Sequence, residues 1–407
     1  MMRPRVLVFS SLFPSVARPR HGIFVETRLR HLMRDCAVDV RVIAPVPWFP
    51  FRSNVFGKYA ELAATPRYAT RDNGLKISHP RYRMIPRLGV PFQPESMARA
   101  ALADVNALRQ TGWTPDIIDA HYFYPDGVAA AILAEQLQIP FLITARGTDI
   151  NVLAKLATTG RRIVWAARRA AGVVAVSTRL KEALVALGVE ESHIVVLRNG
   201  VDLEAFRPED TTAAREQLGL PKGHIAACVG NLLPEKGQSL AIEMLPLLPE
   251  LHLVIVGDGP TRGELISLSH RLGVSPRVTF MPNMRQQELQ TLYSSVDVLL
   301  LPSTREGWPN VVLESLACGT PVVATDVGAV GEMLTNPSVG RIVVGRDPTD
   351  FAHAVAEVLQ SPSSGESIRL HAARFDWGSI SRGQMEAFSR ALQKVPSDAV
   401  GALAASS

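Results

Sequence analysis

The sequence is short of cysteine and of long apolar runs. Its 407 residues hold three cysteines, Cys36, Cys228 and Cys318, which lie far apart and form no C-x-x-C pair. This argues against a disulfide framework or a cysteine-based zinc site, and it fits a reducing compartment. No uninterrupted apolar stretch reaches the roughly 20 residues needed to cross a bilayer. We therefore expect a cytoplasmic protein.

The N-terminus, "MMRPRVLVFSSLFP", has two arginines and a short apolar run. A signal peptide also begins this way, but Ser10, Ser11 and Pro14 cut the run short. A first parallel β-strand is the interpretation that we prefer, because buried strands are also short and apolar.

Charge is unevenly distributed along the chain. Residues 1–180 contain 25 Lys and Arg against 12 Asp and Glu, whereas the remainder contains 18 basic and 26 acidic residues. A chain of this length is too long for one ordinary hydrophobic core, so we expect two domains. The uneven charge indicates that these domains have different partners. The first half is suited to an anionic partner such as nucleic acid, an acidic polymer or an anionic membrane.

Short apolar runs alternate with helical patterns throughout both halves. This alternation predicts α/β architecture with parallel sheets covered on both faces, in two doubly wound, Rossmann-like domains that face a central cleft. We expect an N-terminal domain over 1–198, a C-terminal domain over 199–375, a last helix over 376–394 and a disordered tail over 395–407. Expected strands are 5–11, 38–45, 116–122, 141–145, 172–177, 193–199, 224–230, 251–257, 277–282, 296–302 and 320–325, and expected helices include 24–35, 126–138 and 178–187.

Two glycine-containing loops follow expected strands. "VIVGDGPTRGEL" resembles a dinucleotide fingerprint, but its third glycine is one residue late, and a tight strand-to-helix turn explains it equally well. In "GNLLPEKGQSL", Gly230 permits close backbone approach and Lys236 can neutralise a phosphate. A solvated loop lysine is the alternative.

The stretch "EGWPNVVLE" carries Glu306 and Glu314 eight positions apart, around a helix that we expect to begin near Asn310. The amides of Val311 and Val312 are then unpaired donors at the positive end of a helix dipole, which suits a diphosphate. Glu314 can accept hydrogen bonds from a ribose diol, and Glu306 can meet another polyol. A nucleotide-sugar has this combination of groups.

The stretch resembles the E-x7-E signature of the retaining glycosyltransferases of family 4, which have the GT-B fold. Further matches occur in the expected order from about residue 8 to 345. They are "PRHGIFVETRLRHL", "DAHYFYPDG", "ARGTDI", "VSTRLKEAL", "RNGVDLEAFRP", "VGNLLPEKG", "VIVGDGP", "VTFMPN" and "CGTPVVATDVGAVGE".

The resemblance implies metal-independent hexosyl transfer, without a cofactor, from a nucleotide diphosphate sugar to a glycan or lipid-linked acceptor in cell-surface polysaccharide biosynthesis. Its catalytic residues would be His121 facing the sugar, Lys236 at the leaving diphosphate and Glu306 on the sugar hydroxyls. The last helix would pack back on the N-terminal domain. The implied donor-binding residues are Gly22, Arg146, Asp149, Gly230, Asn231, Met281, Asn310, Val311, Val312 and Glu314.

Two positions depart from the family pattern. Asn231 stands where an arginine is common, and Arg146 replaces the histidine of an H-G-x-D motif. We expect the second change to offset the first, with Asp149 either orienting Arg146 or contacting a ligand. Alternatives are a GT-B nucleotide-sugar epimerase, a non-catalytic nucleotide-sugar-binding protein and a dinucleotide-dependent oxidoreductase.

An arginine-rich segment in the N-terminal half, 155–172, surrounds Ile163, Val164 and Trp165 with the cations of Arg161, Arg162, Arg168 and Arg169. It could rest on an anionic leaflet at the inner face of the cell membrane, beside "PWFPFR" (47–52), and receive the acceptor there. A solvated helix face and a packed aromatic loop are the alternatives. No nucleic-acid partner is expected.

Overall fold

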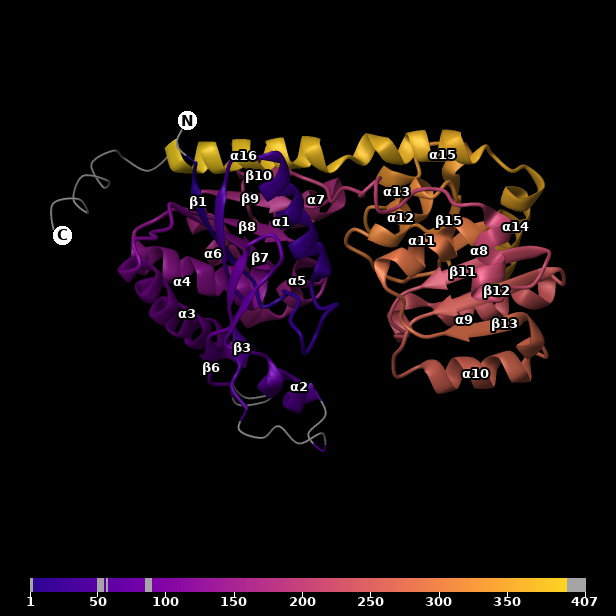
Figure 1. Ribbon diagram of the computed structural model, residues 1–407, viewed down its shortest axis with the longest axis horizontal. Helices are drawn as coiled ribbons and strands as arrows, with labels where there is room; N and C mark the ends of the chain where they lie inside the picture. The colour runs from indigo at the N-terminus through magenta and orange to yellow at the C-terminus, as the bar shows by residue number, and fades with distance from the viewer. Residues whose placement is uncertain (1–2, 50–54, 56–57, 85–89, 394–407) are drawn as a thin grey trace. The chain divides into compact units, whose positions relative to one another are not determined.

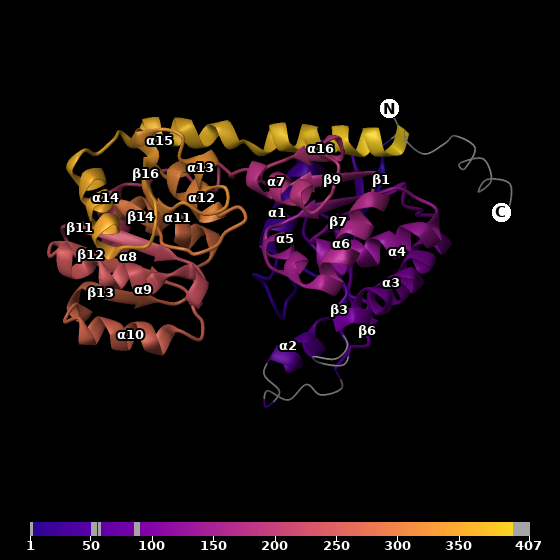
Figure 2. The ribbon, with the colours of Figure 1, turned by 180° about the vertical axis from the view of Figure 1, so that it is seen from behind.

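The chain forms two α/β units in this computed structural model, which describes residues 3–49, 55, 58–84 and 90–393. Unit 1 holds the described residues up to Arg198 and from Trp377 onward, and unit 2 holds Asn199–Asp376. The expected tail, 395–407, and part of 47–52 lie outside the described residues. Both units have helices beside a mostly parallel sheet (Figure 1, Figure 2).

The main sheet of unit 1 has the order β10-β9-β8-β7-β1-β2-β5-β4, and only the β4–β5 pair is antiparallel. Its strands are β1 (Arg5–Phe9), β2 (Asp39–Ile43), β4 (Tyr68–Thr70), β5 (Lys76–Ser78), β7 (Ile117–His121), β8 (Phe141–Ala145), β9 (Gly172–Ala175) and β10 (Ile194–Val196), and a separate pair is β3 (Val46–Pro47) with β6 (Arg81–Tyr82). Its helices are α1 (Ile23–Asp35), α2 (Lys58–Ala64), α3 (Gln93–Gln110), α4 (Val128–Leu137), α5 (Thr148–Asn151), α6 (Ala157–Arg169), α7 (Thr178–Ala186) and α16 (Trp377–Gln393).

The sheet of unit 2 is parallel throughout, in the order β13-β12-β11-β14-β15-β16, which is the strand order of a Rossmann fold. Its strands are β11 (His224–Val229), β12 (Leu251–Val256), β13 (Val278–Met281), β14 (Val298–Leu301), β15 (Val322–Thr325) and β16 (Gly340–Val343). Its helices are α8 (Thr211–Leu218), α9 (Gln238–Glu243), α10 (Arg262–Arg271), α11 (Gln286–Ser295), α12 (Asn310–Ala317), α13 (Val330–Met333), α14 (Pro348–Gln360) and α15 (Gly365–Ala372).

Strand β1 shows why the apolar runs of this chain are continuous. Val6 and Val8 pack into one cluster with Leu29 of α1 and Phe388 of α16. Successive strand side chains point to opposite faces, so Leu7 and Phe9, which are also fully buried, lie on the other face. The α/β class and the N-terminal strand are therefore confirmed, and the last helix belongs to the core of unit 1.

Several elements differ from the sequence-based expectations. Helix α3 lies between the expected strands 38–45 and 116–122, where we predicted no element, although Met97, Ala101 and Val105 recur on its buried face. Strand β16 was also missed. A π-turn over Phe123–Gly127 precedes α4, so this helix begins two residues later than predicted. Short edge strands and local turns carry weak sequence signals, because tertiary pairing decides them.

Candidate functional site

Each sheet reverses its strand order at one point, between β1 and β7 in unit 1 and between β11 and β14 in unit 2. In doubly wound sheets ligands bind beyond the carboxyl ends of the strands at such a switch point. His121 ends β7, Gly230 follows β11, and Glu306 follows β14. The predicted site residues thus collect at the switch point of each unit, and the two sets are described separately.

The loop after β11 approaches the loop after β14 through Gly237. A Cβ atom on Gly237 would lie 2.0 Å from the Pro302 carbonyl oxygen, and its φ is +68°, so this position requires glycine. Gly230 also has positive φ (+151°), with open space where a Cβ would be. Asn231 is exposed, and its carbonyl accepts a 3.1 Å bond from Gln238. The close approach places Lys236 beside the β14 loop.

Lys236 and Glu306 form an ion pair, with 2.7 Å between Nζ and Oε1. The Ser303 hydroxyl donates a 2.7 Å bond to the same carboxylate oxygen. The side chain of Glu306 is only 10% exposed, whereas that of Lys236 is 30% exposed, so solvent or a ligand reaches the lysine more easily. Two residues predicted for separate contacts are therefore direct partners in this structure. Ser303 is a third member that sequence reasoning missed.

The end of β15 and the segment after it contact the loop that carries Glu306. The Thr325 hydroxyl donates 2.5 Å and 3.2 Å bonds to the carbonyls of Ser303 and Leu301. A Cβ on Gly328 would lie 2.5 Å from the Glu306 carbonyl oxygen, so only glycine allows this contact. These contacts explain why the "GTPVVATDVG" stretch accompanies the two glutamates in the sequence.

Helix α12 begins at Asn310, as expected, and no side chain caps its N-terminus. The amide of Val312 is not the unpaired donor that we expected, because it donates a 3.1 Å bond to the Pro309 carbonyl in a tight first turn. The Val311 amide has no partner among the residues that the structure describes. The Asn310 side chain accepts a 3.2 Å bond from Asn199, which ties the "RNG" motif to this helix start.

Glu314 lies one turn into α12, where Tyr293 donates a 3.1 Å bond to its Oε2. Burial raises the pKa of Glu314 to about 7, although the Tyr293 bond opposes that shift. Near neutral pH this carboxyl is therefore present in both protonation states. Met281, at the end of β13, accepts a 3.1 Å backbone bond from Gly257 and so lies beside the "VGDGP" turn.

His121, at the switch point of unit 1, has both ring nitrogens engaged. Nδ1 accepts a 2.7 Å bond from Arg146, and Nε2 lies 3.4 Å from Asp119 Oδ2. The side chain is 2% exposed, and burial lowers its pKa to about 4, so the ring is neutral at physiological pH. The imidazole is thus placed to orient Arg146, with little surface of its own.

Two arginines, Arg28 and Arg146, lie in this buried region, and the carboxylate of Asp119 acts on the pKa of both. Burial lowers the pKa of Arg146 to about 9 and that of Arg28 to about 10, and both remain protonated at neutral pH. Arg28 donates a 2.7 Å bond to Gln384 of α16, and Asp119 Oδ1 is buried with no hydrogen-bond partner among the described residues. Arg28 and Asp119 were missed as functional positions, although both lie inside quoted motifs.

Asp149 accepts bonds from the amides of Phe123, Arg146 and Gly147, at 2.8 to 3.2 Å. It is fully buried, so of the two expected roles the geometry supports orientation of the Arg146 loop. Gly22 precedes α1 with φ +73°, and a Cβ there would lie 2.2 Å from the Leu12 carbonyl oxygen. It therefore allows the β1–α1 loop to fold back on itself.

Comparisons with known proteins agree on one family. Residues 22–205 match the family described as "Glycosyltransferase Family 4", and residues 210–374 match "Glycosyl transferases group 1". The teichuronic acid biosynthesis glycosyltransferase TuaC of Bacillus subtilis is 34% identical over 81% of this chain and 82% of its own. A D-inositol 3-phosphate glycosyltransferase of Acidothermus cellulolyticus is 32% identical over 72% of this chain and 71% of its own.

Solved structures show the same fold. The sucrose-phosphate synthase of Thermosynechococcus elongatus superposes with a TM-score of 0.77 at 20% identity, over 96% of this chain and 99% of that one. HepE of Anabaena in complex with UDP-glucose superposes with a TM-score of 0.71 at 20% identity, over 95% of this chain and 100% of that one.

Proposed function

Because this chain belongs to the glycosyltransferases of the GT-B fold, with a family 4 N-terminal region and a group 1 C-terminal region, we propose that it transfers a hexose from a nucleotide diphosphate sugar. The acceptor is a lipid-linked or polysaccharide glycan of the cell surface. The observation that carries the proposal is the Lys236–Glu306–Ser303 cluster beside the start of α12. It combines a cation, a helix start and a carboxylate, which suit a diphosphate and a sugar.

The donor is held by unit 2. The ribose diol donates to Glu314, the diphosphate meets the Val311 amide and the positive end of α12, and the base lies near Met281. Gly22 keeps the assignment to the donor phosphates that the family resemblance gives it. HepE, a protein of the same fold, was crystallised with UDP-glucose, which makes uracil the first base to test.

The diphosphate and Glu306 compete for Lys236, and charge decides the outcome. Two unit charges 4 Å apart attract by roughly 4 kcal/mol at an effective dielectric constant of 20. The diphosphate carries more negative charge than one carboxylate, so it draws Lys236 away from Glu306. Ser303 keeps its bond to Glu306, and the freed acceptor sites of that carboxylate receive sugar hydroxyls. Donor binding therefore converts the ion pair into two ligand contacts.

Transfer then proceeds with retention and without a metal ion. The bond between the anomeric carbon and the β-phosphate oxygen breaks, and Lys236 with the helix start stabilises the charge that develops. The acceptor hydroxyl attacks from the same face, and its proton passes to the departing phosphate oxygen. Unaltered turnover in the presence of EDTA is the expected result for the metal-independent step.

The acceptor region is assigned to unit 1, where positive charge predominates. Unit 1 also holds Arg146, which we assign to the donor, and His121 and Asp149 position its side chain and backbone through the bonds described above. This cation offsets the neutral Asn231 in the donor half. The relative TuaC is named for teichuronic acid biosynthesis, and this name supports an acidic cell-surface polymer as the acceptor. No helix among the described residues is long and apolar enough to span a membrane. The excess of basic residues in the first half of the chain is our reason for placing the protein at the cytoplasmic face of the membrane as a peripheral protein.

A thermal-shift panel of UDP, GDP, ADP and TDP sugars tests the donor assignment. We expect one nucleotide class to raise the melting temperature, and slow release of that nucleotide diphosphate without acceptor to identify a competent transferase. The exposed Asn231 favours a second candidate, a non-catalytic nucleotide-sugar-binding protein. Stabilisation by a donor without nucleotide release, even with cell-envelope extracts, would favour that candidate.

A further inference from the structure

Helix α6 presents an unusual outward face. Its buried stripe consists of small and apolar residues, with Ile163, Ala166 and Ala167 fully buried. An outward stripe at helical spacing would ordinarily be polar. Here Val164 and Trp165 occupy two of its positions, one turn from arginines on either side.

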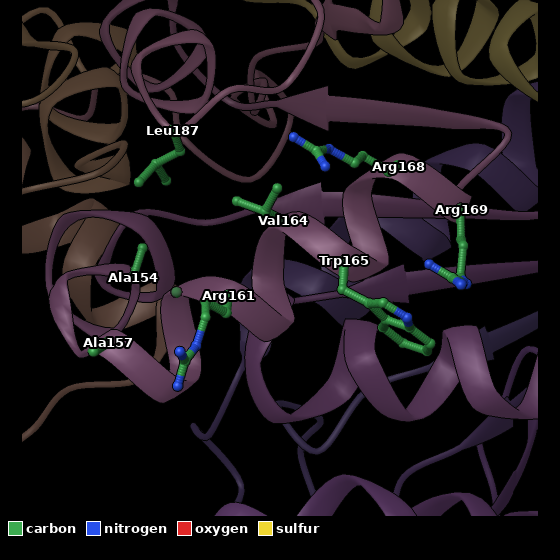
Figure 3. Close-up of a pocket in the computed structure, with 9 residues that line it drawn as sticks. Ala154, Ala157, Arg161, Val164, Trp165, Arg168, Arg169 and Leu187 are labelled. Carbon is green, nitrogen blue, oxygen red and sulfur yellow. The ribbon is translucent and has the colours of Figure 1, made fainter.

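A hollow of about 460 Å³ opens on this face. Figure 3 shows Val164 and Leu187 extending into it from α6 and from the end of α7, with Arg161 and Arg168 on opposite sides of Val164. Ala154 and Ala157 complete an apolar floor. Leu156 beside it is 56% exposed, so apolar surface continues beyond the rim.

The rim of the hollow is cationic. Arg161, Arg168 and Arg169 line it, and no acidic residue of the described part of the chain does. The guanidinium of Arg169 lies 4.5 Å from the centre of the Trp165 ring, which holds both side chains in place. Arg162 is not part of this rim, because it pairs with Glu95 on α3. Of the four arginines expected to face a membrane, three therefore line the same hollow.

We propose that this hollow, the α6 groove, binds an anionic phospholipid of the membrane leaflet. The headgroup phosphate lies between Arg161 and Arg168, and the first carbons of an acyl chain cover Val164 and Leu187. The groove has apolar surface for hydrocarbon and guanidinium groups for phosphate, which is the pattern of interfacial lipid binding. A glycan is a poorer match, since the described residues that line the groove include no carboxylate or amide side chain to accept bonds from its hydroxyls.

The lipid site extends the proposed function, because it brings unit 1 to the membrane surface where a lipid-linked acceptor resides. Its biological role therefore rests on the proposed function. Its binding test does not require turnover. Each basic residue near an anionic surface contributes about a fivefold change in binding constant. Charge reversal at two positions should therefore weaken vesicle binding by about 25-fold or more.

The experiment is co-sedimentation of the full chain with vesicles of phosphatidylcholine containing phosphatidylglycerol, and with pure phosphatidylcholine. The test variant is Arg161→Glu with Arg168→Glu. The control, Arg99→Glu with Arg382→Glu, changes net charge equally at exposed positions of unit 1 outside the groove. A Val164→Ser, Leu187→Ser variant tests the apolar floor.

We expect binding only to the anionic vesicles, a loss of about 25-fold or more in the test variant, a partial loss in the floor variant and no loss beyond twofold in the control. Equal losses in test and control, or no binding at low salt, overturn the proposal. Preference for a soluble polyuronate over vesicles overturns it in favour of a glycan site. Thermal shift with nucleotide sugars is measured on the same samples, so failure of donor binding is seen separately.

Discussion

The ion pair between Lys236 and Glu306 leads to a prediction in which two ligands respond oppositely to one substitution. Glu306→Gln keeps the shape of the side chain and its bond from Ser303, but removes the charge that holds Lys236. A nucleoside diphosphate without sugar needs the lysine and not the carboxylate. A nucleotide sugar needs both.

The structure sets the size of each effect. The pair is partly shielded from solvent, so its release contributes about 0.5–1 kcal/mol, at the upper end of the range for exposed pairs. The free diphosphate should then bind about two- to fivefold more tightly. Loss of a hydrogen bond between a charged carboxylate and a sugar hydroxyl costs about 1.5–3 kcal/mol. Turnover measured as kcat/KM should fall about 10- to 150-fold.

Isothermal titration with the nucleoside diphosphate and its sugar, together with steady-state transfer or slow donor hydrolysis, measures both effects. Glu235→Gln is the matched control, because Glu235 pairs with Arg305 in the neighbouring loop at 3.6 Å and is not assigned to the donor. Weaker binding of the free diphosphate in Glu306→Gln, or unchanged turnover, would refute the exchange of partners by Lys236.

Three further predictions follow from the same contacts. Arg146→Ala should lower turnover or donor binding by more than about tenfold, the size of one charged hydrogen bond, and an enzyme with unchanged kinetics would show that this cation is not used. Since the pKa of Glu314 is about 7, nucleotide affinity should rise as pH increases through 7 and the acceptor-only carboxylate forms; titrations at pH 6 and 8 should differ for the native chain but not for Glu314→Gln. The same raised pKa makes this carboxyl's contribution to the free energy of unfolding fall as pH rises from 4.5 to about 7. Gly237→Ala should lower the free energy of unfolding of unit 2, measured in urea. The positive φ costs about 1–2 kcal/mol, and the clash of the new Cβ with Pro302 adds to this cost. The control is Gly263→Ala, which should not destabilise, because nothing lies within 4 Å of its Cβ position.

Much of the architecture was accessible from sequence patterns. Apolar strands alternating with helices predicted parallel sheets, since both sheet faces are covered and the strands need no polar side. The stretch around Glu306 and Glu314 predicted a helix beginning at Asn310, because proline and asparagine precede an apolar run. Helix α3 escaped because proline- and aromatic-rich segments before it obscured a periodicity that Met97, Ala101 and Val105 do carry.

The order of the motifs along the chain sufficed to indicate the family and the kinds of group that a ligand would meet. Which side chains are partners was decided by the tertiary structure. Lys236 and Glu306 lie 70 residues apart, and His121 and Arg146 lie 25 apart. Sequence spacing specifies contacts within one helix or strand, whereas these contacts arise from parallel strands that end at one sheet edge. Only that arrangement shows that Lys236, which we predict to bind phosphate, is paired with a carboxylate in this structure, and that His121, which we predict to face the sugar, is hydrogen-bonded to Arg146.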